Sequence, residues 1–356
     1  MFEKFFSQAS SKWMEGTGEE ADIVISSRVR LARNISAIPF PHLLQTTEAK
    51  KVVAMIYEAL QSLQSNEQVK DLTPVYLQDL QPIERSILVD KHLISPQHAE
   101  EAGGRGLLIS QDEDISILIN EEDHLRIQCL YSGLELEKVW NEASQVDDLF
   151  ESVLDFAFDE KLGYLTACPT NVGTGLRASV MMHLPALVMT NQATRVLASL
   201  SQLGMTVRGL YGEGTEATGN LFQISNQVTL GRSEEEIISS LLVVAKQLID
   251  QERMARHVLL KETKNQLEDQ VCRAYGALTH ARVMSSQESM SLLSKVRLGI
   301  DVGIIKTASL QTMNEMLVLT RPAFLQKMKG KELSPFERDV QRATMIREKL
   351  LDKIEK

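Results

Sequence analysis

A short β-branched run at residues 23–25 is followed by a basic stretch, Ser26-Ser27-Arg28-Val29-Arg30-Leu31-Ala32-Arg33-Asn34. Arg28 and Arg30 lie two residues apart, so both side chains point to the same face of an extended strand. Two guanidinium groups on one face match phosphate oxygens in a bidentate geometry. Taken alone, the stretch fits either a phosphate-binding strand or a solvated basic strand at the edge of a sheet.

Three further polar clusters lie downstream. Residues 120–126, Asn-Glu-Glu-Asp-His-Leu-Arg, end an apolar run, and a carboxylate there suits a general base or a site for a cation. Residues 168–179 form a Gly/Thr-rich loop that is expected to enter a helix and to bind an anion. Residues 207–216 combine a basic residue, a glycine-rich loop and carboxylates. An acidic turn, a structural loop and a mobile surface loop are the respective alternatives.

The composition is that of a folded protein without a basic excess. The chain has 356 residues, 43% of them hydrophobic, and a formal net charge of −10. This length favours two domains, and the acidic balance speaks against a general nucleic-acid-binding protein. The three cysteines, Cys129, Cys168 and Cys272, include no Cys-x-x-Cys pair, which argues against a disulfide framework or a zinc site.

Absent motifs exclude several classes of protein. The chain has no Walker-type phosphate loop, no His-Arg-Asp or Asp-Phe-Gly motif, no complete dinucleotide fingerprint, no His-Glu-x-x-His and no Gly-x-Ser-x-Gly. It shows no signal peptide, and no apolar stretch approaches the roughly 20 residues that span a bilayer. We therefore expect a cytoplasmic protein with no membrane partner and no direct nucleic-acid partner.

The spacing of apolar residues predicts three long helices. The first covers residues 48–63, and the second covers residues 146–161 and is ended by Gly163. The third runs from Ser233 to about residue 260, because a capping box at its start precedes an apolar stripe.

Short β-rich runs followed by helices favour an α+β unit with a helical appendix. Apolar runs at residues 107–109 and 115–119, separated by a polar turn, predict a hairpin. Residues 1–21 are expected to be a flexible lead-in, residues 22–255 the main domain and residues 260–356 a small helical domain, because glycines become sparse there.

In order and spacing, the four clusters resemble the phosphagen kinases, the family of the creatine and arginine kinases. Residues 120–126 and 168–174 match two signature blocks of that family, and residues 88–92 match a third. The resemblance covers residues 22–255 and implies an antiparallel sheet flanked by helices. The basic block begins by residue 26, so the family's N-terminal helical domain, which grips the small guanidino substrate, is expected to be missing.

A C-terminal block adds to the resemblance, Arg338-Asp339-Val340-Gln341-Arg342-Ala343. A kinase domain of this type with such an appendix is similar to the bacterial protein-arginine kinases. The similarity implies transfer of the γ-phosphoryl group of ATP to arginine residues in proteins. It also implies a phosphoarginine pocket at Arg338, Asp339, Arg342 and Ala343. A plain intrahelical ion pair between Asp339 and Arg342 is the alternative.

The resemblance assigns the catalytic chemistry to Glu122 as general base, to Glu213 as its partner carboxylate and to Cys168 as a residue that tunes the guanidinium. Because arginine is charged at neutral pH, it needs carboxylates that orient it and accept its proton. Mg²⁺ is expected on the phosphates and water, with no metal ligand from the protein. A small buried hydrophobe is the alternative role of Cys168.

The resemblance also carries an ATP site over to this sequence, with five arginines as a phosphate clamp. The site comprises Ser27, Arg28, Val29, Arg30, Leu31, His92, Arg126, Arg177, Ala178, Ser179, Val180, Met181, Arg208, Gly209, Leu210, Tyr211, Gly212 and Glu213.

Partners follow from the resemblance alone. It implies protein substrates that include unfolded proteins and the repressor CtsR, the activator McsA, the Clp protease machinery and a homodimer. A kinase for a small guanidino metabolite such as free arginine is one alternative. A weakly active adaptor that binds ATP and phosphoarginine is the other.

Overall fold

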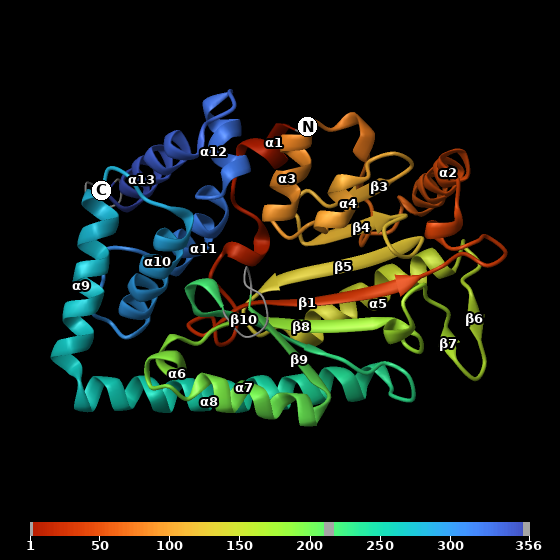
Figure 1. Ribbon diagram of the computed structural model, residues 1–356. Helices are drawn as coiled ribbons and strands as arrows, with labels where there is room; N and C mark the ends of the chain where they lie inside the picture. The colour runs from red at the N-terminus through yellow and green to blue at the C-terminus, as the bar shows by residue number, and fades with distance from the viewer. Residues whose placement is uncertain (1–2, 210–216, 352–356) are drawn as a thin grey trace.

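An eight-stranded antiparallel sheet forms the centre of the computed structural model, which describes residues 3–209 and 217–351 (Figure 1). Its strands, in spatial order, are β2 (Thr73–Tyr76), β3 (Gly106–Ile109), β4 (Ile115–Ile119), β5 (Leu125–Ser132), β1 (Val24–Arg33), β8 (Leu176–His183), β10 (Leu221–Asn226) and β9 (Met205–Gly209). The basic strand β1 is therefore central, between β5 and β8. The fold is α+β with an antiparallel sheet, as expected, and the hairpin of β3 and β4 is confirmed.

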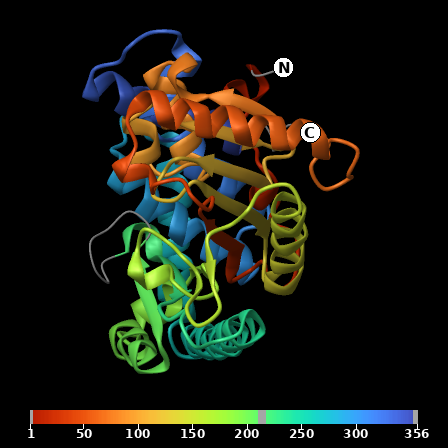
Figure 2. The same cartoon turned by 90° about the vertical axis from the view of Figure 1, so that its right-hand side faces the viewer.

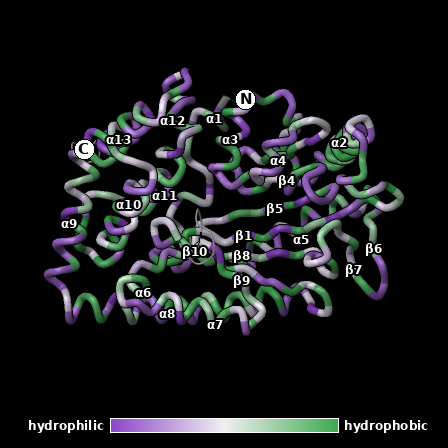
Figure 3. Tube along the Cα trace, viewed as in Figure 1, coloured by the Kyte–Doolittle hydropathy of each residue, from purple (hydrophilic) through white to green (hydrophobic). Residues whose placement is uncertain are grey.

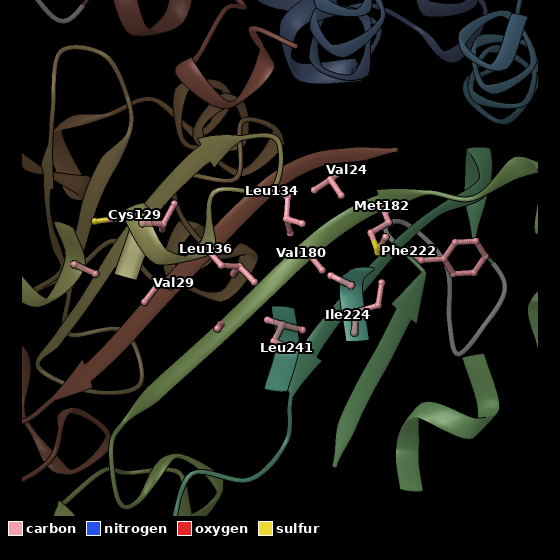
Figure 4. Packing of buried hydrophobic residues seen from close by; sticks show 14 of the residues in the cluster. Val24, Val29, Cys129, Leu134, Leu136, Val180, Met182, Phe222, Ile224 and Leu241 are labelled. Atoms are coloured by element: carbon pink, nitrogen blue, oxygen red, sulfur yellow. The ribbon is translucent and has the colours of Figure 1, made fainter. Parts of the chain in front are cut away.

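Three helices cover one face of this sheet: α2 (Thr46–Leu63), α5 (Leu136–Glu151) and α8 (Glu234–Glu262). Figure 4 shows Val180 of β8 and Ile224 of β10 near Leu241 of α8. In Figure 2, α2 crosses the end of the sheet that contains β2, β3 and β4. The short helices α6 (Pro185–Met189) and α7 (Ala193–Ser199) follow β8, and α6 lies against α8.

The C-terminal part is helical and packs beside the opposite face of the sheet (Figure 1). It consists of α9 (Lys264–His280), α10 (Ser286–Asp301), α11 (Leu310–Leu319), α12 (Pro322–Lys329) and α13 (Pro335–Leu351). The helices on the first face cover one hydrophobic cluster. A second hydrophobic cluster, on the opposite face, contains Phe324 of α12, Leu88 of α3 (Pro82–Asp90) and Met181 of the sheet. The short helix α4 (Pro96–Glu100) follows α3.

Two of the three predicted helices are confirmed. α2 matches the first, and α8 begins at the predicted capping box, in which the Ser233 hydroxyl accepts a hydrogen bond from the backbone of Glu236. α8 ends at Glu262 and α9 begins at Lys264, so a single residue separates them near the predicted domain boundary.

The predicted helix over residues 146–161 is wrong. Helix α5 begins ten residues earlier and ends at Glu151. The chain beyond it is extended, because Phe156 is buried and its backbone bridges to Ile35 beyond β1. Gly163, with a φ of 79°, lies in the small hairpin of β6 (Phe158–Asp159) and β7 (Gly163–Tyr164).

The Gly/Thr-rich loop also differs from its prediction. Residues 176–183, after the loop, form β8 and not a helix, so no helix N-terminus is available there to bind an anion. The loop instead leads directly into β8, which pairs with β1.

The expectation of a flexible lead-in is wrong for the described part of that segment. α1 (Glu3–Ser7) and the 3₁₀ turn Lys12–Met14 pack into the second hydrophobic cluster. Trp13 is fully buried and Phe6 is 4% exposed, because the C-terminal helices cover them. The segment therefore belongs to the core.

Figure 3 shows hydrophilic and hydrophobic residues in turn along α8, as expected of a helix with one face on a core. Within residues 3–209 and 217–351, no helix has the length and apolarity needed to cross a membrane.

Arg33, the last residue of β1, joins three segments. Its side chain is 1% exposed, and its guanidinium pairs with Asp147 of α5 at 2.6 Å. The same guanidinium donates to the carbonyl of Thr174 at 2.9 Å and lies 3.5 Å from the ring centroid of Tyr164. Burial raises the pKa of Asp147 to about 6 even beside this cation. Arg33 is thus a structural residue of the basic stretch, unlike Arg28 and Arg30, which lie on the opposite face.

Arg33→Met is expected to lower the free energy of unfolding by about 3–5 kcal/mol, because Asp147 would keep a buried carboxylate without its partner. Adding Asp147→Leu to this variant should restore most of the loss. Urea denaturation measures both effects. The exposed Lys138, which pairs with Glu135, provides the control, since Lys138→Ala should cost less than about 1 kcal/mol. An equal cost for both single variants would contradict the structural role of Arg33.

Candidate active site

Strand register brings the five arginines to one face of the sheet. Residues directly opposite in an antiparallel pair point to the same side. Arg30 lies opposite Arg177 of β8, and Ala32, on the same face as Arg30, lies opposite Arg126 of β5. The β8 and β10 strands extend this face to the edge strand β9, where Arg208 lies opposite Gln223. Together with Arg28, these residues form what we call the arginine face.

The arginine face holds more positive charge than the described protein groups neutralise. Burial, together with Arg126 and Arg177, lowers the pKa of Arg28 to about 10, which leaves it protonated at neutral pH. Burial and the neighbouring cations also lower the pKa of Arg30. Among the described residues, the Arg30 Nε atom is buried and has no hydrogen-bond partner. Repelling cations held by a rigid sheet form a site for a polyanion.

The acidic loop beside this face exposes one carboxylate. Glu122 is exposed, whereas Asn120, Glu121, Asp123 and His124 are 4%, 7%, 2% and 0% exposed. The Asn120 side chain, at a residue with φ of 58°, donates to two backbone carbonyls of neighbouring segments. The His124 ring accepts a hydrogen bond from the backbone N–H of Ile35 at 3.0 Å. The buried residues therefore hold the loop, and Glu122 is free to meet a ligand.

Glu121 pairs with Arg126 of the arginine face and accepts a hydrogen bond from Ser95 at 2.5 Å. Burial acts to raise the pKa of Glu121, but Arg126 and the Ser95 hydrogen bond outweigh it and lower the pKa below its usual value. Glu121 therefore stays ionised and orients Arg126.

Asp123 connects the acidic loop to the Cys168 segment. Its Oδ1 atom accepts hydrogen bonds from the Asn34 side chain at 2.6 Å and from the backbone N–H of Ala167 at 2.7 Å. Glu122 directly precedes Asp123 and Cys168 directly follows Ala167, so this bond brings the two residues into the same part of the site. Glu122 and Cys168 are both electrostatic neighbours of Arg177 of the arginine face. The Cys168 Sγ atom lies 3.0 Å from the Thr170 hydroxyl and is half-buried, not sealed in the core.

A small pocket on the same face contains His92. Its lining also includes Ser26, Arg28, Leu130, Ser179, Met181 and Gln223. Burial, with Arg28 and Arg321, lowers the pKa of His92 to about 3, so its ring is neutral at physiological pH. Sequence reasoning missed Gln223 as a candidate ligand of this pocket. Only the pairing of β10 with β8 reveals it, because it places Gln223 opposite Met181.

Other predicted ATP residues lie on the helix-covered face of the same strands. Their side chains are 0% exposed, so their contact with a nucleotide would come from the backbone; they are Ser27, Val29, Leu31, Ala178 and Val180. Gly209 ends β9. Leu210, Tyr211, Gly212 and the proposed second catalytic carboxylate, Glu213, lie outside the described residues.

The C-terminal block lies on α13, where its residues have unequal surroundings. Arg342 is 2% exposed and donates to the carbonyls of Thr320 at 2.8 Å and Met284 at 2.9 Å. It also forms the intrahelical ion pair with Asp339. Ala343 is buried, whereas Arg338 and Asp339 are half-buried and accessible.

Comparisons with known proteins match both parts of the chain. Residues 51–255 match the family described as ATP:guanido phosphotransferase, C-terminal catalytic domain. Residues 264–356 match the family described as protein-arginine kinase McsB C-terminal domain.

Curated relatives match almost the full length. A protein-arginine kinase of Desulforamulus reducens is 57% identical over 340 residues, covering 96% of this chain and 95% of the relative. One of Moorella thermoacetica is 55% identical over 343 residues, covering 96% and 98%. Among solved structures, a lombricine kinase is similar with a TM-score of 0.58 and 25% identity, covering 71% of this chain and 75% of that chain.

The neutral state of His92 can be tested by NMR. Its ring resonance, identified by its loss in His92→Gln, should not titrate between pH 8 and about 5, because its folded pKa is near 3. In the urea-unfolded chain the same ring should titrate near 6.5. The unfolded state then binds the proton first, so His92 destabilises the fold as pH falls below about 6.5. A folded-state midpoint above pH 6 would contradict the burial of this ring beside Arg28.

Proposed function

The chain belongs to the protein-arginine kinases of the ATP:guanido phosphotransferase family, and on that premise we propose that its arginine face and Glu122 transfer the γ-phosphoryl group of ATP to arginine side chains of proteins. The observation that carries this assignment of roles is the placement of five arginines on one sheet face beside the exposed carboxylate of Glu122. A polyanion and a cation are thus received side by side.

The arginine face binds the triphosphate. Arg28, Arg30, Arg126, Arg177 and Arg208 neutralise the phosphate oxygens and hold the γ-phosphorus in line with its acceptor. Phosphoryl transfer needs little covalent help from the enzyme, so positioning and charge stabilisation supply most of the rate. The nucleoside end lies over the residues at the mouth of the small His92 pocket, which include Ser179, Met181 and Gln223.

Glu122 receives the acceptor. Its carboxylate orients the substrate guanidinium and accepts one proton as the new N–P bond forms. The bond between the γ-phosphorus and the β,γ-bridging oxygen breaks at the same time, and ADP leaves. Glu213 is the second carboxylate on the basis of the resemblance. Cys168, beside Glu122, contacts the guanidinium and tunes its charge without forming a covalent intermediate.

Mg²⁺ accompanies ATP in this proposal. The described residues contain no group of three His, Cys, Asp or Glu side chains that could hold a metal. The donor set near the phosphates is cationic, so the ion fits a position on the phosphate oxygens and water. When bound, Mg²⁺ neutralises charge on the transferred phosphoryl group.

The C-terminal block is proposed as a phosphoarginine site with divided roles. Arg338 binds the phosphoryl group and Asp339 the guanidinium, since both are accessible. Arg342 and Ala343 are buried and shape the site from below, with Arg342 fixing Asp339.

Cellular partners are proposed from the family resemblance. The substrates would include unfolded proteins and the repressor CtsR, and phosphorylation would mark proteins for the Clp protease machinery in the cytoplasm. McsA would act as activator, and the enzyme would work as a homodimer.

A kinase assay with Mg-ATP tests the function, comparing an unstructured arginine-rich protein with free arginine. Acid-labile, base-stable phosphate is expected on the protein. Glu122→Gln should lower kcat by about 10²- to 10⁴-fold with ATP binding unchanged, because the proton acceptor is lost while the arginine face remains. Glu137→Gln, at an exposed glutamate of α5, is the matched control and should keep full activity.

Comparable rates on free arginine would instead identify a metabolite kinase. Phosphate on neither acceptor, with McsA present, would leave the adaptor function. A Glu122→Gln variant with normal kcat would remove Glu122 from the mechanism.

Phosphoarginine binding separates the roles within the C-terminal block. Arg338→Ala and Asp339→Ala should each weaken binding of a phosphoarginine peptide at least about tenfold, the equivalent of one charge-assisted hydrogen bond. Arg338→Ala should leave the melting temperature unchanged, whereas Asp339→Ala also removes the ion pair with the buried Arg342 and should lower it. Arg342→Met should lower the melting temperature, because it leaves two buried carbonyls unpaired. Calorimetry and thermal denaturation measure the two effects. Full peptide affinity in both alanine variants would contradict the proposed site.

A further inference from the structure

A tryptophan from the N-terminal segment packs against His92, a lining residue of the pocket proposed above for the nucleoside. Trp13 is fully buried, and its ring centroid lies 5.5 Å from that of His92 at an interplanar angle of 56°. Its indole N–H donates to the carbonyl of Lys91 at 3.1 Å, one residue before His92. Trp13 therefore contacts both the ring of His92 and the backbone that carries it.

His92 needs such support because its backbone is unfavourable. Its φ is 62°, in the left-handed region that a residue with a side chain rarely adopts. The side chain of Gln128 on β5 donates a hydrogen bond to the carbonyl of His92 itself at 2.8 Å. Two hydrogen bonds, to the carbonyls of Lys91 and His92, and the aromatic contact with Trp13 thus support the strained residue.

The segment that carries Trp13 is itself fixed to the catalytic part by buried charges. The Ser11 hydroxyl donates to Glu113, and the other oxygen of Glu113 pairs with Lys91 at 2.6 Å. Lys12 pairs with Asp114 and lies 4.5 Å from the ring centroid of Tyr131. The contacts through Glu113 end at Lys91, the residue before His92, so they connect the segment to the His92 turn.

The C-terminal part fixes the same segment from the other side. The Asn314 side chain of α11 donates to the carbonyl of Met14 at 3.2 Å, and its oxygen accepts from Arg297 of α10. Trp13 thus packs with His92 on one side and shares a hydrophobic cluster with Leu317 and Phe324 of the C-terminal helices.

We infer that Trp13 is a positioning residue for nucleotide binding: it holds His92 in its strained conformation at the wall of the ATP pocket. The inference rests on the proposed function for the identity of the ligand in that pocket. Trp13 acts through His92 and not on the phosphates, so its loss affects the affinity for nucleotide more than the chemical step.

Trp13→Phe keeps an aromatic ring and removes the indole N–H. It is expected to raise KM for ATP about fivefold, the value of one neutral hydrogen bond, with kcat nearly unchanged. The matched control is Trp140→Phe, because Trp140 is the only other tryptophan of the chain and its indole N–H also donates, at 2.7 Å, to Glu234. This control should keep the wild-type KM.

Fluorescence gives a readout that a merely structural role would not produce. In the Trp140→Phe protein, Trp13 is the sole tryptophan, and Mg-ADP should change its emission in a saturable manner. In the Trp13→Phe protein, Trp140 should not respond. No saturable response of Trp13, together with an unchanged KM in Trp13→Phe, would overturn the inference.

The two proposals can fail separately. A Trp13 response to Mg-ADP in a protein that phosphorylates no arginine would keep the inference and refute the proposed function. Arginine phosphorylation with neither a response nor a KM effect would do the reverse. If Trp13→Phe fails to fold, the fluorescence of the Trp140→Phe protein decides the question, because that protein retains Trp13.

Discussion

Five guanidinium groups repel one another on one face of the sheet. The rest of the catalytic part must hold them together against this repulsion. Strand β1 has neighbours on both sides, and its register with β5 and β8 places Arg28 and Arg30 among Arg126 and Arg177. Burial, with the neighbouring cations Arg126 and Arg177, lowers the pKa of Arg28 to about 10, so its charged form is less favourable here than in water. Hydrophobic packing of the opposite face against α5 and α8 offsets this cost (Figure 4). An anion bound on the arginine face reduces this repulsion, and the reduction contributes to its binding free energy.

Within each polar block, most side chains are buried and hold the segment in place, and only a few are accessible to a ligand. In the acidic loop, buried side chains latch the loop to β1, to α2 and to the Cys168 segment, and Glu122 alone is exposed. In the basic stretch, Arg33 turns to the opposite face and joins α5 to the Gly/Thr-rich loop. In the C-terminal block, Arg342 bonds to backbone carbonyls, and Arg338 is accessible. In each block, the buried polar residues therefore position the few accessible ones.

Local periodicity explains what could be predicted from the sequence. The shared face of Arg28 and Arg30 and the extent of α2 and α8 depend only on spacing within one segment. The predicted helix over residues 146–161 is wrong because Phe156 pairs with Ile35, a contact across more than a hundred residues. Gln223 was missed for the same reason, since its place beside Met181 depends on strand order. The grouping of Arg126, Arg177 and Arg208 came from the family resemblance, and strand register supplies its physical cause.

The bond between Asn314 and the carbonyl of Met14 has a consequence for biosynthesis. These partners are 300 residues apart, and Trp13 packs in the same core as Phe324. At about 5–20 residues per second, a ribosome completes α11 roughly 15–60 s after it makes the tryptophan. During that interval the sheet can pair its strands, but this apolar segment has no cover from the C-terminal helices. In a nascent chain, the side of Trp13 and Phe6 that packs against the C-terminal helices therefore stays uncovered until translation is nearly finished.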